Sequence, residues 1–244
     1  MYKRQKYNTA GSVVWARQVF SIGDNDNSGV CIDEHTNSVY VTGSMDGDAT
    51  FGSTVVSGNP GTYVYVAKYD SQGNTKWVVS SQPNASCDNF GKAIATDASG
   101  NVYATGSFGC MMAIGTSTLT TSGTDYDMFL AKYDSSGVFQ WVIQGGSAND
   151  DEGNGVCVNN TGNIFVAGKF GGSATFGTMT VNSYGTEDIF LSKYNAAGAI
   201  QFVEHAGTVD ADAAKAICAD GSGNIYITGN VNNTSALTLS LIHI

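Results

Sequence analysis

The chain has 244 residues, of which 31 are glycine and only two are proline, and 13% of its residues are charged. A formal charge of −10 without a Lys/Arg cluster disfavours nucleic acids and anionic membrane surfaces as partners, because like charges repel. No apolar run reaches the roughly 18 residues of a membrane span. The 12 tyrosines and 11 phenylalanines, among many glycines, favour strands joined by tight turns, so we expect a soluble all-β protein.

The chain repeats a unit of about 62 residues. Four segments of the type Gly-Asn-(Val/Ile)-Tyr-x-Thr-Gly superimpose, and their last glycines are spaced by 63, 62 and 61 residues. These glycines are Gly43, Gly106, Gly168 and Gly229. A second motif, Lys-Tyr-(Asp/Asn), keeps the same period and is followed by a large aromatic residue. The lysine and aromatic pairs are Lys6 and Trp15, Lys68 and Trp77, Lys132 and Trp141, and Lys193 and Phe202.

Each unit predicts four short strands, which in the second unit span 91–97, 101–108, 127–134 and 139–144. The connections after the first and third strands are tight Asp/Asn and Gly turns. A meander of four antiparallel strands buries both of its faces when copies pack around an axis, as the blades of a β-propeller do. The fold expected is therefore an incomplete, open β-propeller. The alternative is an open β-solenoid, whose coils are usually shorter.

The ordered motifs resemble a known family. Asp-x-x-Gly-Asn-(Val/Ile)-Tyr-x-Thr-Gly, then Phe-Leu-Ala-Lys-Tyr-Asp-x-x-Gly, then Trp, is similar to the bacterial seven-bladed β-propeller repeat family over residues 6–238. The resemblance implies a propeller in a large exported or surface-attached bacterial protein, and it supplies no catalytic residues. The copies depart from the pattern at Ser38, Asn195 and Phe202.

The pattern breaks at both ends of the chain. Arg4 and its neighbours stand where the other units have a buried apolar strand, and the last six residues fit no unit. Both tails match translations of a transposase adapter used in sequencing libraries, so we expect them to be adapter-derived and the rest to be an interior fragment that lacks further blades. A natural start and stop is the alternative. The expected divisions are tail 1–5, the end of a preceding blade 6–27, blades 28–90, 91–153 and 154–213, a partial blade 214–238, and tail 239–244.

The five cysteines fall into two groups. Cys31, Cys157 and Cys218 share one position in the first strand of their units, too far apart for disulfides, so we expect free, packed thiols. Cys87 and Cys110 flank one hairpin symmetrically and could form a disulfide, which would support an oxidising, exported setting. The alternative is two unrelated thiols.

Acidic residues gather in the connections between units, which also vary most in length, as binding loops on a rigid scaffold do. Such carboxylates could ring a channel mouth and hold Ca²⁺, and Asp24–Gly29 matches the first half of a calcium loop, although His35 stands where the loop needs Glu. The alternative is that they are solvated turn and capping groups. The candidate calcium ligands are Asp24, Asp26, Asp88, Asp150, Asp151, Asp210 and Asp212.

Other recurring residues are interpreted as structural. The turn residues are expected to bond their own backbone, and the tryptophans to pack between blades rather than to stack on sugars. The repeated lysines are expected to snorkel or to pair with a strand acid. The turn residues are Asp33, Asp97, Asn159 and Asp220, and the strand acids are Asp127 and Asp188.

Catalysis needs a constellation that occurs once, and the residues that break the repeat are scattered along the sequence. They are His35, His205 with Glu204, Met111 with Met112, and Glu152. We therefore expect a non-catalytic scaffold or binding module, without a cofactor other than possible calcium, that presents a protein or glycan site on its acidic loop face. The alternatives are a polysaccharide-active hydrolase or lyase and a purely structural spacer. By resemblance, the location expected is extracellular or at the cell surface.

Overall fold

The computed structural model describes residues 2–21, 23, 25–58, 61–82, 87–121, 125–232 and 238–239. Every regular element in these residues is a β-strand, and all paired strands run antiparallel, so the predicted all-β class is confirmed. None of these residues forms a helix with the length and hydrophobicity to cross a membrane.

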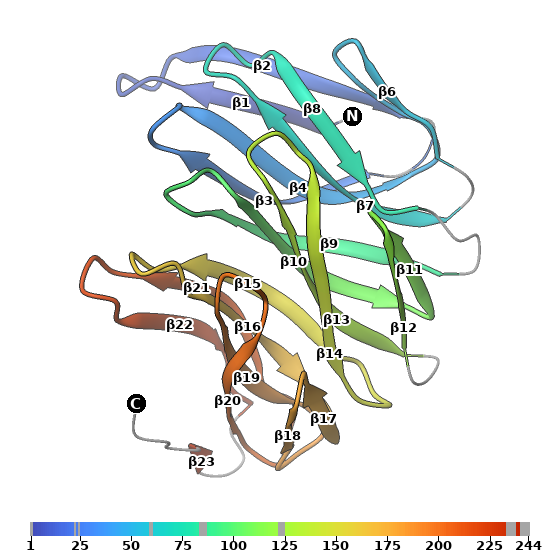
Figure 1. Ribbon diagram of the computed structural model, residues 1–244, viewed down its shortest axis with the longest axis vertical. Coiled ribbons are helices and arrows are strands. Elements are labelled where there is room, and N and C mark those ends of the chain that lie inside the picture. Colours follow the sequence, from blue (N-terminus) through green and yellow to red (C-terminus); the bar gives the residue numbers. More distant parts are fainter. Residues whose placement is uncertain are drawn as a thin grey trace.

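Three sheets contain a complete meander of four consecutive main strands (Figure 1). In the second unit the strands begin and end within two residues of the predicted bounds. The first meander consists of β3 (Asn25–Asp33), β4 (Ser38–Asp46), β7 (Thr62–Tyr69) and β8 (Thr75–Ser80). The second consists of β9 (Asn89–Thr96), β10 (Val102–Gly109), β13 (Tyr126–Tyr133) and β14 (Phe139–Gly146). The third consists of β15 (Glu152–Val158), β16 (Ile164–Phe170), β19 (Asp188–Tyr194) and β20 (Ile200–Gly207).

The two outermost sheets each contain half of this pattern. β1 (Tyr2–Tyr7) and β2 (Val13–Ser21) carry the Lys6 and Trp15 motif and so correspond to the third and fourth strands of a unit. β21 (Ala213–Ala219) and β22 (Ile225–Asn230) carry the Gly229 motif and correspond to the first and second strands. The described ends of the chain are therefore complementary halves of one meander.

Short hairpins between the second and third strands were not predicted. In two units the hairpin adds to the outer edge of the preceding sheet, where Phe51 pairs with Val19 and Phe176 with Gly145. In the remaining unit an isolated bridge joins Ala113 to Gln82. The sequence signal is Ala-Thr-Phe-Gly, which occurs twice and alternates buried and solvent-facing residues. The hairpins are β5 (Ala49–Phe51) with β6 (Thr54–Val56), β11 (Met111–Ile114) with β12 (Ser117–Thr120), and β17 (Ser173–Phe176) with β18 (Met179–Asn182); β23 (Thr238–Leu239) joins β20 in the same manner.

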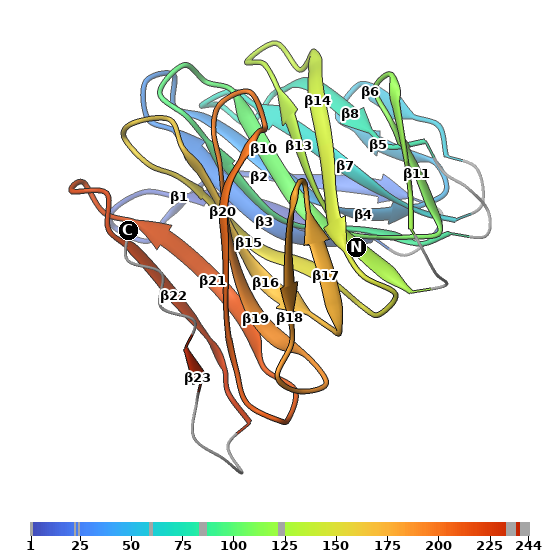
Figure 2. The ribbon, with the colours of Figure 1, turned by 60° about the horizontal axis from the view of Figure 1, so that its bottom comes forward.

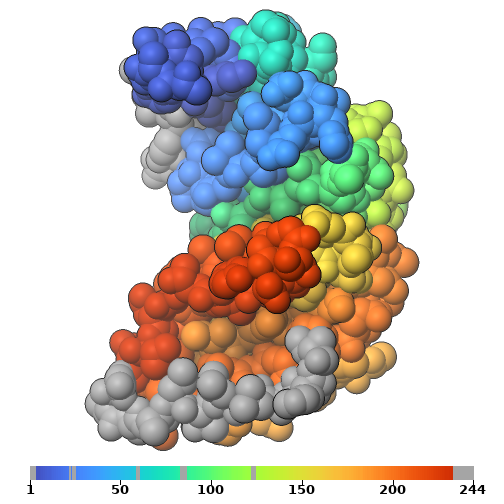
Figure 3. All heavy atoms as spheres, turned by 90° about the vertical axis from the view of Figure 1, so that its left-hand side faces the viewer, coloured from blue at the N-terminus to red at the C-terminus, as the bar shows by residue number. Residues whose placement is uncertain are grey.

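The core lies between successive sheets, which explains why the strands are apolar on both faces. One cluster joins Tyr40 and Val66 of one sheet to Val102 and Phe129 of the next, and all four are buried. The sheets follow one another as a curved stack (Figure 3), and they fan apart toward one side (Figure 2).

The recurring glycines are explained by a close approach between the first two strands. Each stands opposite a bulge, and a Cβ at Gly106 would lie 1.8 Å from the carbonyl oxygen of Phe90. At Gly168 the distance to the oxygen of Glu152 would be 1.7 Å. Only glycine leaves room for that backbone, so the strand position accepts no side chain.

Arg4 lies at a position of β1 that the repeat predicts to be apolar. Its side chain is buried against the rings of Phe51, Tyr65 and Tyr69, and Nη2 donates to the hydroxyl of Tyr65 at 2.7 Å. Nε and Nη1 have no hydrogen-bond partner among the described residues. Burying unpaired donors is costly, which agrees with the expectation that an apolar residue belongs at this position.

Candidate functional site

A shallow channel of about 290 Å³ runs along the first strands of four successive sheets, β3, β9, β15 and β21. These strands approach closely because the residues at the contact are small. A Cβ on Gly29 would lie 3.0 Å from Cα of Ala93, and one on Gly155 would lie 3.0 Å from Cγ2 of Ile217. At the bulge of each strand one polar residue lines the channel. These residues are Ser28, Lys92, Asn154 and Lys215.

An ion-pair chain links the sheets beside this channel. Lys92 lies 2.6 Å from Glu152, and Lys169 lies 2.6 Å from Glu187 and 4.0 Å from Glu152. Burial lowers the pKa of Lys169, but the hydrogen bond to Glu187 and the charge of Glu152 together raise it above its ordinary value. Glu152, one of the residues that break the repeat, therefore joins adjacent sheets.

The loop acids that the structure describes differ in burial and in hydrogen bonding. Asp151 and Asp212 are fully buried, and their carboxylates accept hydrogen bonds from backbone N–H groups, such as those of Ser147 and Thr208. These bonds are of the capping kind, although both carboxylates are buried and not solvated as the alternative to metal binding expected. Asp150 is half-buried and accepts from the N–H of Tyr126. Asp26 and Asp88 are exposed, Asp210 is half-buried, and Asp24 lies outside the described residues.

No three His, Cys, Asp or Glu side chains of the described residues are grouped as a metal site requires. Calcium binding accordingly stays a prediction. It rests chiefly on the loop acids that face solvent.

Asp127 of β13 and Asp151, in the connection between β14 and β15, form a buried carboxyl pair. Oδ1 of Asp127 and Oδ2 of Asp151 lie 2.2 and 3.0 Å from the point where Gly146 would carry a Cβ. Oδ1 of Asp127 has no hydrogen-bond partner in the described part of the chain. Burial raises the pKa of Asp127 to about 7, against the hydrogen bond from the Ser147 backbone. Burial, aided by the charge of Asp127, also raises that of Asp151 to about 7.

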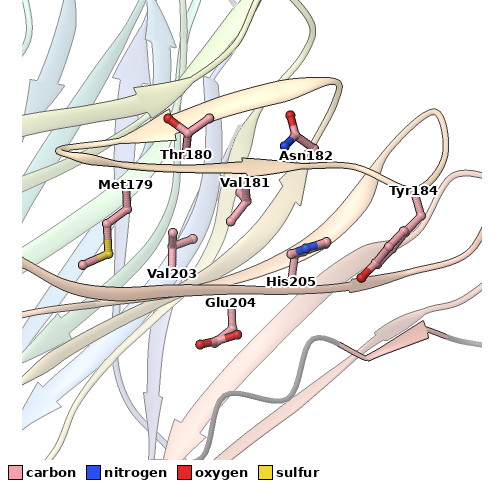
Figure 4. A pocket seen from close by; sticks show the side chains of 8 residues that line it. All are labelled: Met179, Thr180, Val181, Asn182, Tyr184, Val203, Glu204 and His205. Carbon is pink, nitrogen blue, oxygen red and sulfur yellow. The ribbon is translucent and has the colours of Figure 1, made fainter.

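A groove of about 430 Å³ lies between the hairpin β17–β18 and strand β20 (Figure 4). Val203 and His205 point from β20 toward the hairpin, whereas Glu204 points to the opposite side. The ring of His205 lies 4.8 Å from that of Tyr184, and Nδ1 lies 3.5 Å from Oδ2 of Asp188. Asp188 is buried and accepts from the backbone N–H of Tyr184 at 2.9 Å. His205 is thus a non-repeated histidine whose ring lies beside a buried carboxylate.

The other residues that break the repeat lie elsewhere. His35 is exposed in a turn, where its N–H donates to Asp33 at 2.9 Å. Met112 is fully buried in the core, and Met111 is exposed. The structure thus brings none of these residues to the groove at His205.

The repeated lysines were expected to snorkel or to pair with a strand acid, and the tryptophans to pack between blades. Lys68 Nζ and Trp77 Nε1 both donate to the carbonyl oxygen of Ser135, in the turn of the next sheet, so the tryptophan lies between successive sheets and the lysine bonds a backbone oxygen instead of a strand acid. We call each lysine and aromatic pair with its acceptor carbonyl a latch. Lys6 and Trp15 form a latch with Ser71, and Lys132 and Trp141 with Ala196. The acceptor is a backbone atom, which no side-chain pattern could reveal.

Cys87 and Cys110 form a disulfide with Cα atoms 5.6 Å apart. Cys31, Cys157 and Cys218 are free. Burial raises the pKa of Cys157 to about 12 and of Cys31 to about 12, which disfavours the thiolate, the nucleophilic form. Cys218 was expected to be packed but is exposed: the equivalent Cys31 packs against residues of the next sheet, such as Ile94, and no further sheet of the described chain covers this face of β21.

No protein-family model matches the chain, and no curated protein matches it.

Proposed function

We propose that this chain is an arc of an open β-propeller that acts as a non-catalytic scaffold and binding module of an exported bacterial surface protein. The observation that carries the proposal is the shared channel along β3, β9, β15 and β21, since the first strands of propeller blades line the central axis. The curved stack of sheets also supports an arc over a linear solenoid (Figure 3). The disulfide supports the exported location, because disulfides persist in oxidising compartments.

Chain extension tests the arc directly. Further copies of residues 91–153 are joined to the chain after residue 213, and the maximum dimension is measured by small-angle X-ray scattering. In a propeller the dimension levels off as the ring nears closure. In a solenoid it grows by a constant step with each added unit, and that result would overturn the arc.

The proposed ligand is a protein or glycan on the acidic loop face, near Asp88 in the connection before β9 and near Asp26, which the structure places within β3; both acids are exposed. The probe is a printed array of neutral and uronic-acid-containing bacterial polysaccharides, read with and without Ca²⁺. The Asp26→Asn and Asp88→Asn double variant should lose binding, whereas Glu34→Gln, an exposed acid in a turn after β3, should keep it. If no sample binds on the array, the purely structural spacer is favoured over a glycan module.

A second candidate, a polysaccharide hydrolase or lyase, is favoured by the His205 and Asp188 pair at the groove. Nδ1 of His205 lies 3.5 Å from Asp188 without a hydrogen bond in the described chain, and a histidine beside a carboxylate is suited to proton transfer. The matched variant is His205→Gln, because Gln144 occupies the same position in the preceding sheet. Turnover of the polysaccharides on the array that is lost in this variant would establish the enzyme, and it would contradict the scaffold.

A further inference from the structure

Three side chains from two successive sheets meet at Nζ of Lys92. This nitrogen lies 2.6 Å from Oε2 of Glu152, and it donates to Oδ1 of Asn154 at 3.3 Å. Lys92 belongs to β9, whereas Glu152 and Asn154 belong to β15, the first strand of the next sheet. An amine, a carboxylate and a carboxamide are therefore in contact across the boundary between two sheets.

Two β-bulges bring the amine and the carboxamide together. Lys92 and Asn154 are the unpaired extra residues of the bulges in β9 and β15, and both line the channel along the first strands. Glu152 stands two residues before its bulge, where the flanking units have Phe90 and Ala213. The carboxylate is thus supplied by a residue that breaks the repeat, as expected of a constellation with a chemical role.

The carboxamide of Asn154 is held from both sides. Its Oδ1 accepts from Lys92, and its Nδ2 donates to the carbonyl oxygen of Ala214 in β21 at 3.0 Å. Oδ1 is bonded to the electrophilic carbon Cγ, so the amine and the carboxamide are held close to the geometry of an intramolecular reaction.

The carboxylate is placed to activate the amine. The side chains of Lys92 and Glu152 are 25% and 23% exposed, and Asn154 is half-buried, so most of their surface is shielded from water. Transfer of one proton from the ammonium to the carboxylate that touches it leaves an uncharged amine, which is the nucleophilic form of lysine. Restricted access of water favours attack by this amine over hydrolysis.

We propose that Lys92 and Asn154 form an intramolecular amide bond that links the second and third meanders covalently, with Glu152 as general base and acid. Lys92 gives a proton to Glu152, and its free amine attacks Cγ of Asn154. A second amine proton moves through Glu152 to the carboxamide nitrogen, and the bond between Cγ and that nitrogen breaks. The departing ammonia takes up the proton first given to Glu152. One lysine ammonium and one carboxamide thus become one secondary amide and one ammonium ion, without an oxidant or co-reactant.

The product leaves no carboxylate without a cation. Lys169 lies 4.0 Å from Glu152 and remains charged after Lys92 has become an amide. The crosslink would hold neighbouring sheets together in a way that suits a scaffold. It concerns contacts between two successive sheets only, so it goes beyond the proposed function and depends on neither the arc nor the ligand.

Intact-mass spectrometry of the full chain, denatured and with its disulfide reduced, tests the bond. The unmodified chain should be lighter than its sequence mass by one ammonia molecule. The Asn154–Gly155 pair would lose the same mass if it cyclised to a succinimide, so proteolysis must locate the loss. A peptide that contains Lys92 should be found joined to one that contains Asn154.

Two variants and two matched controls assign the roles. Lys92→Arg keeps the positive charge but removes the amine, and Glu152→Gln removes the base, so both should have their full sequence mass. Lys215→Arg changes the lysine at the equivalent bulge of β21, and Glu187→Gln changes the carboxylate 2.6 Å from Lys169. Both controls should lose ammonia as the unmodified chain does. Circular dichroism verifies that each variant is folded.

The full sequence mass in the unmodified chain would overturn the proposal whatever the variants do. A loss of ammonia without the joined peptides, or one that persists in Lys92→Arg, would assign the loss to the succinimide and overturn it as well. A folded Glu152→Gln variant that crosslinks as completely as the unmodified chain would contradict the role of Glu152. None of these results bears on the arc, which the chain-extension experiment tests separately.

Discussion

Lys68 and Trp77 donate to the same carbonyl oxygen, that of Ser135, at 3.1 and 3.2 Å. Because the lysine and tryptophan belong to one sheet and the acceptor to the next, the pair ties neighbouring sheets together without a charged partner. Trp77→Phe removes the N–H but keeps a ring, as at Phe202, which holds the equivalent position in the third meander. The free energy of unfolding should fall by about 1 kcal/mol, the net value of one hydrogen bond.

Urea denaturation measures this loss, and a double-mutant cycle with Lys68→Met measures the coupling between the two donors. Because both side chains donate to the carbonyl oxygen of Ser135, the losses of unfolding free energy in the two single variants should not add up to the loss in the double variant. Strictly additive losses would mean that the donors act on separate partners.

Gly137→Ala should be more destabilising than Gly162→Ala. Both glycines have positive φ, at +86° and +77°, so alanine costs about 1–2 kcal/mol of backbone strain at either site. Only at Gly137 would the new Cβ also meet a ring, that of Trp77, at 2.8 Å. Crowding of this kind adds about 1–3 kcal/mol. Chemical denaturation of the two variants should show the difference, and equal losses would contradict the latch contact.

The Asp127 and Asp151 pair predicts that stability falls as pH rises. Burial raises both pKa values from 3.8 to about 7, so the folded chain binds more protons than the unfolded chain between these values. The stabilising contribution of the two protonated carboxyl groups is complete below about pH 4 and is lost as pH rises through about 7. Asp127→Asn removes the ionisation at a site where the first meander has the neutral Tyr63.

Melting temperatures of the unmodified chain and Asp127→Asn, measured from pH 5 to pH 8, test this expectation. At pH 8 the free energy of unfolding of the variant should exceed that of the unmodified chain by on the order of 2 kcal/mol, which raises its melting temperature. The melting temperature of the variant should also change less with pH. Parallel profiles would show that Asp127 does not titrate in this range.

The disulfide between Cys87 and Cys110 closes a loop with a sequence separation of 23. Loss of such a link costs about 3 kcal/mol, chiefly because the unfolded chain gains freedom. Reductant should therefore lower the melting temperature of the unmodified chain but not of the Cys87→Ala and Cys110→Ala double variant. Cys31→Ala, which removes a free thiol, should respond to reductant like the unmodified chain.

The main strands could be predicted from the sequence because their alternation, turn residues and glycines repeat together, as the match at 91–144 shows. The hairpins could have been found from the recurrence of Ala-Thr-Phe-Gly at Ala49 and Ala174, but their pairing with the preceding sheet depends on contacts distant in sequence. The burial of the loop acids was harder to predict, because Asp150 and Asp151 are adjacent in sequence yet only Asp151 is fully buried. Sequence spacing alone does not show which of two neighbouring carboxylates turns inward.

The hairpins that reach back to the preceding sheet mean that covalent and spatial modules do not coincide. Where such a hairpin pairs with the preceding sheet, the outermost strands of that sheet belong to the unit that follows it in the chain. Excision of a unit from its first to its last main strand would therefore remove the edge strands of the preceding sheet. Deletion of one full repeat between two equivalent positions leaves each hairpin next to a sheet with which it can pair. Gain or loss of units during evolution is therefore expected to proceed by whole periods, with breakpoints free to fall anywhere within the repeat.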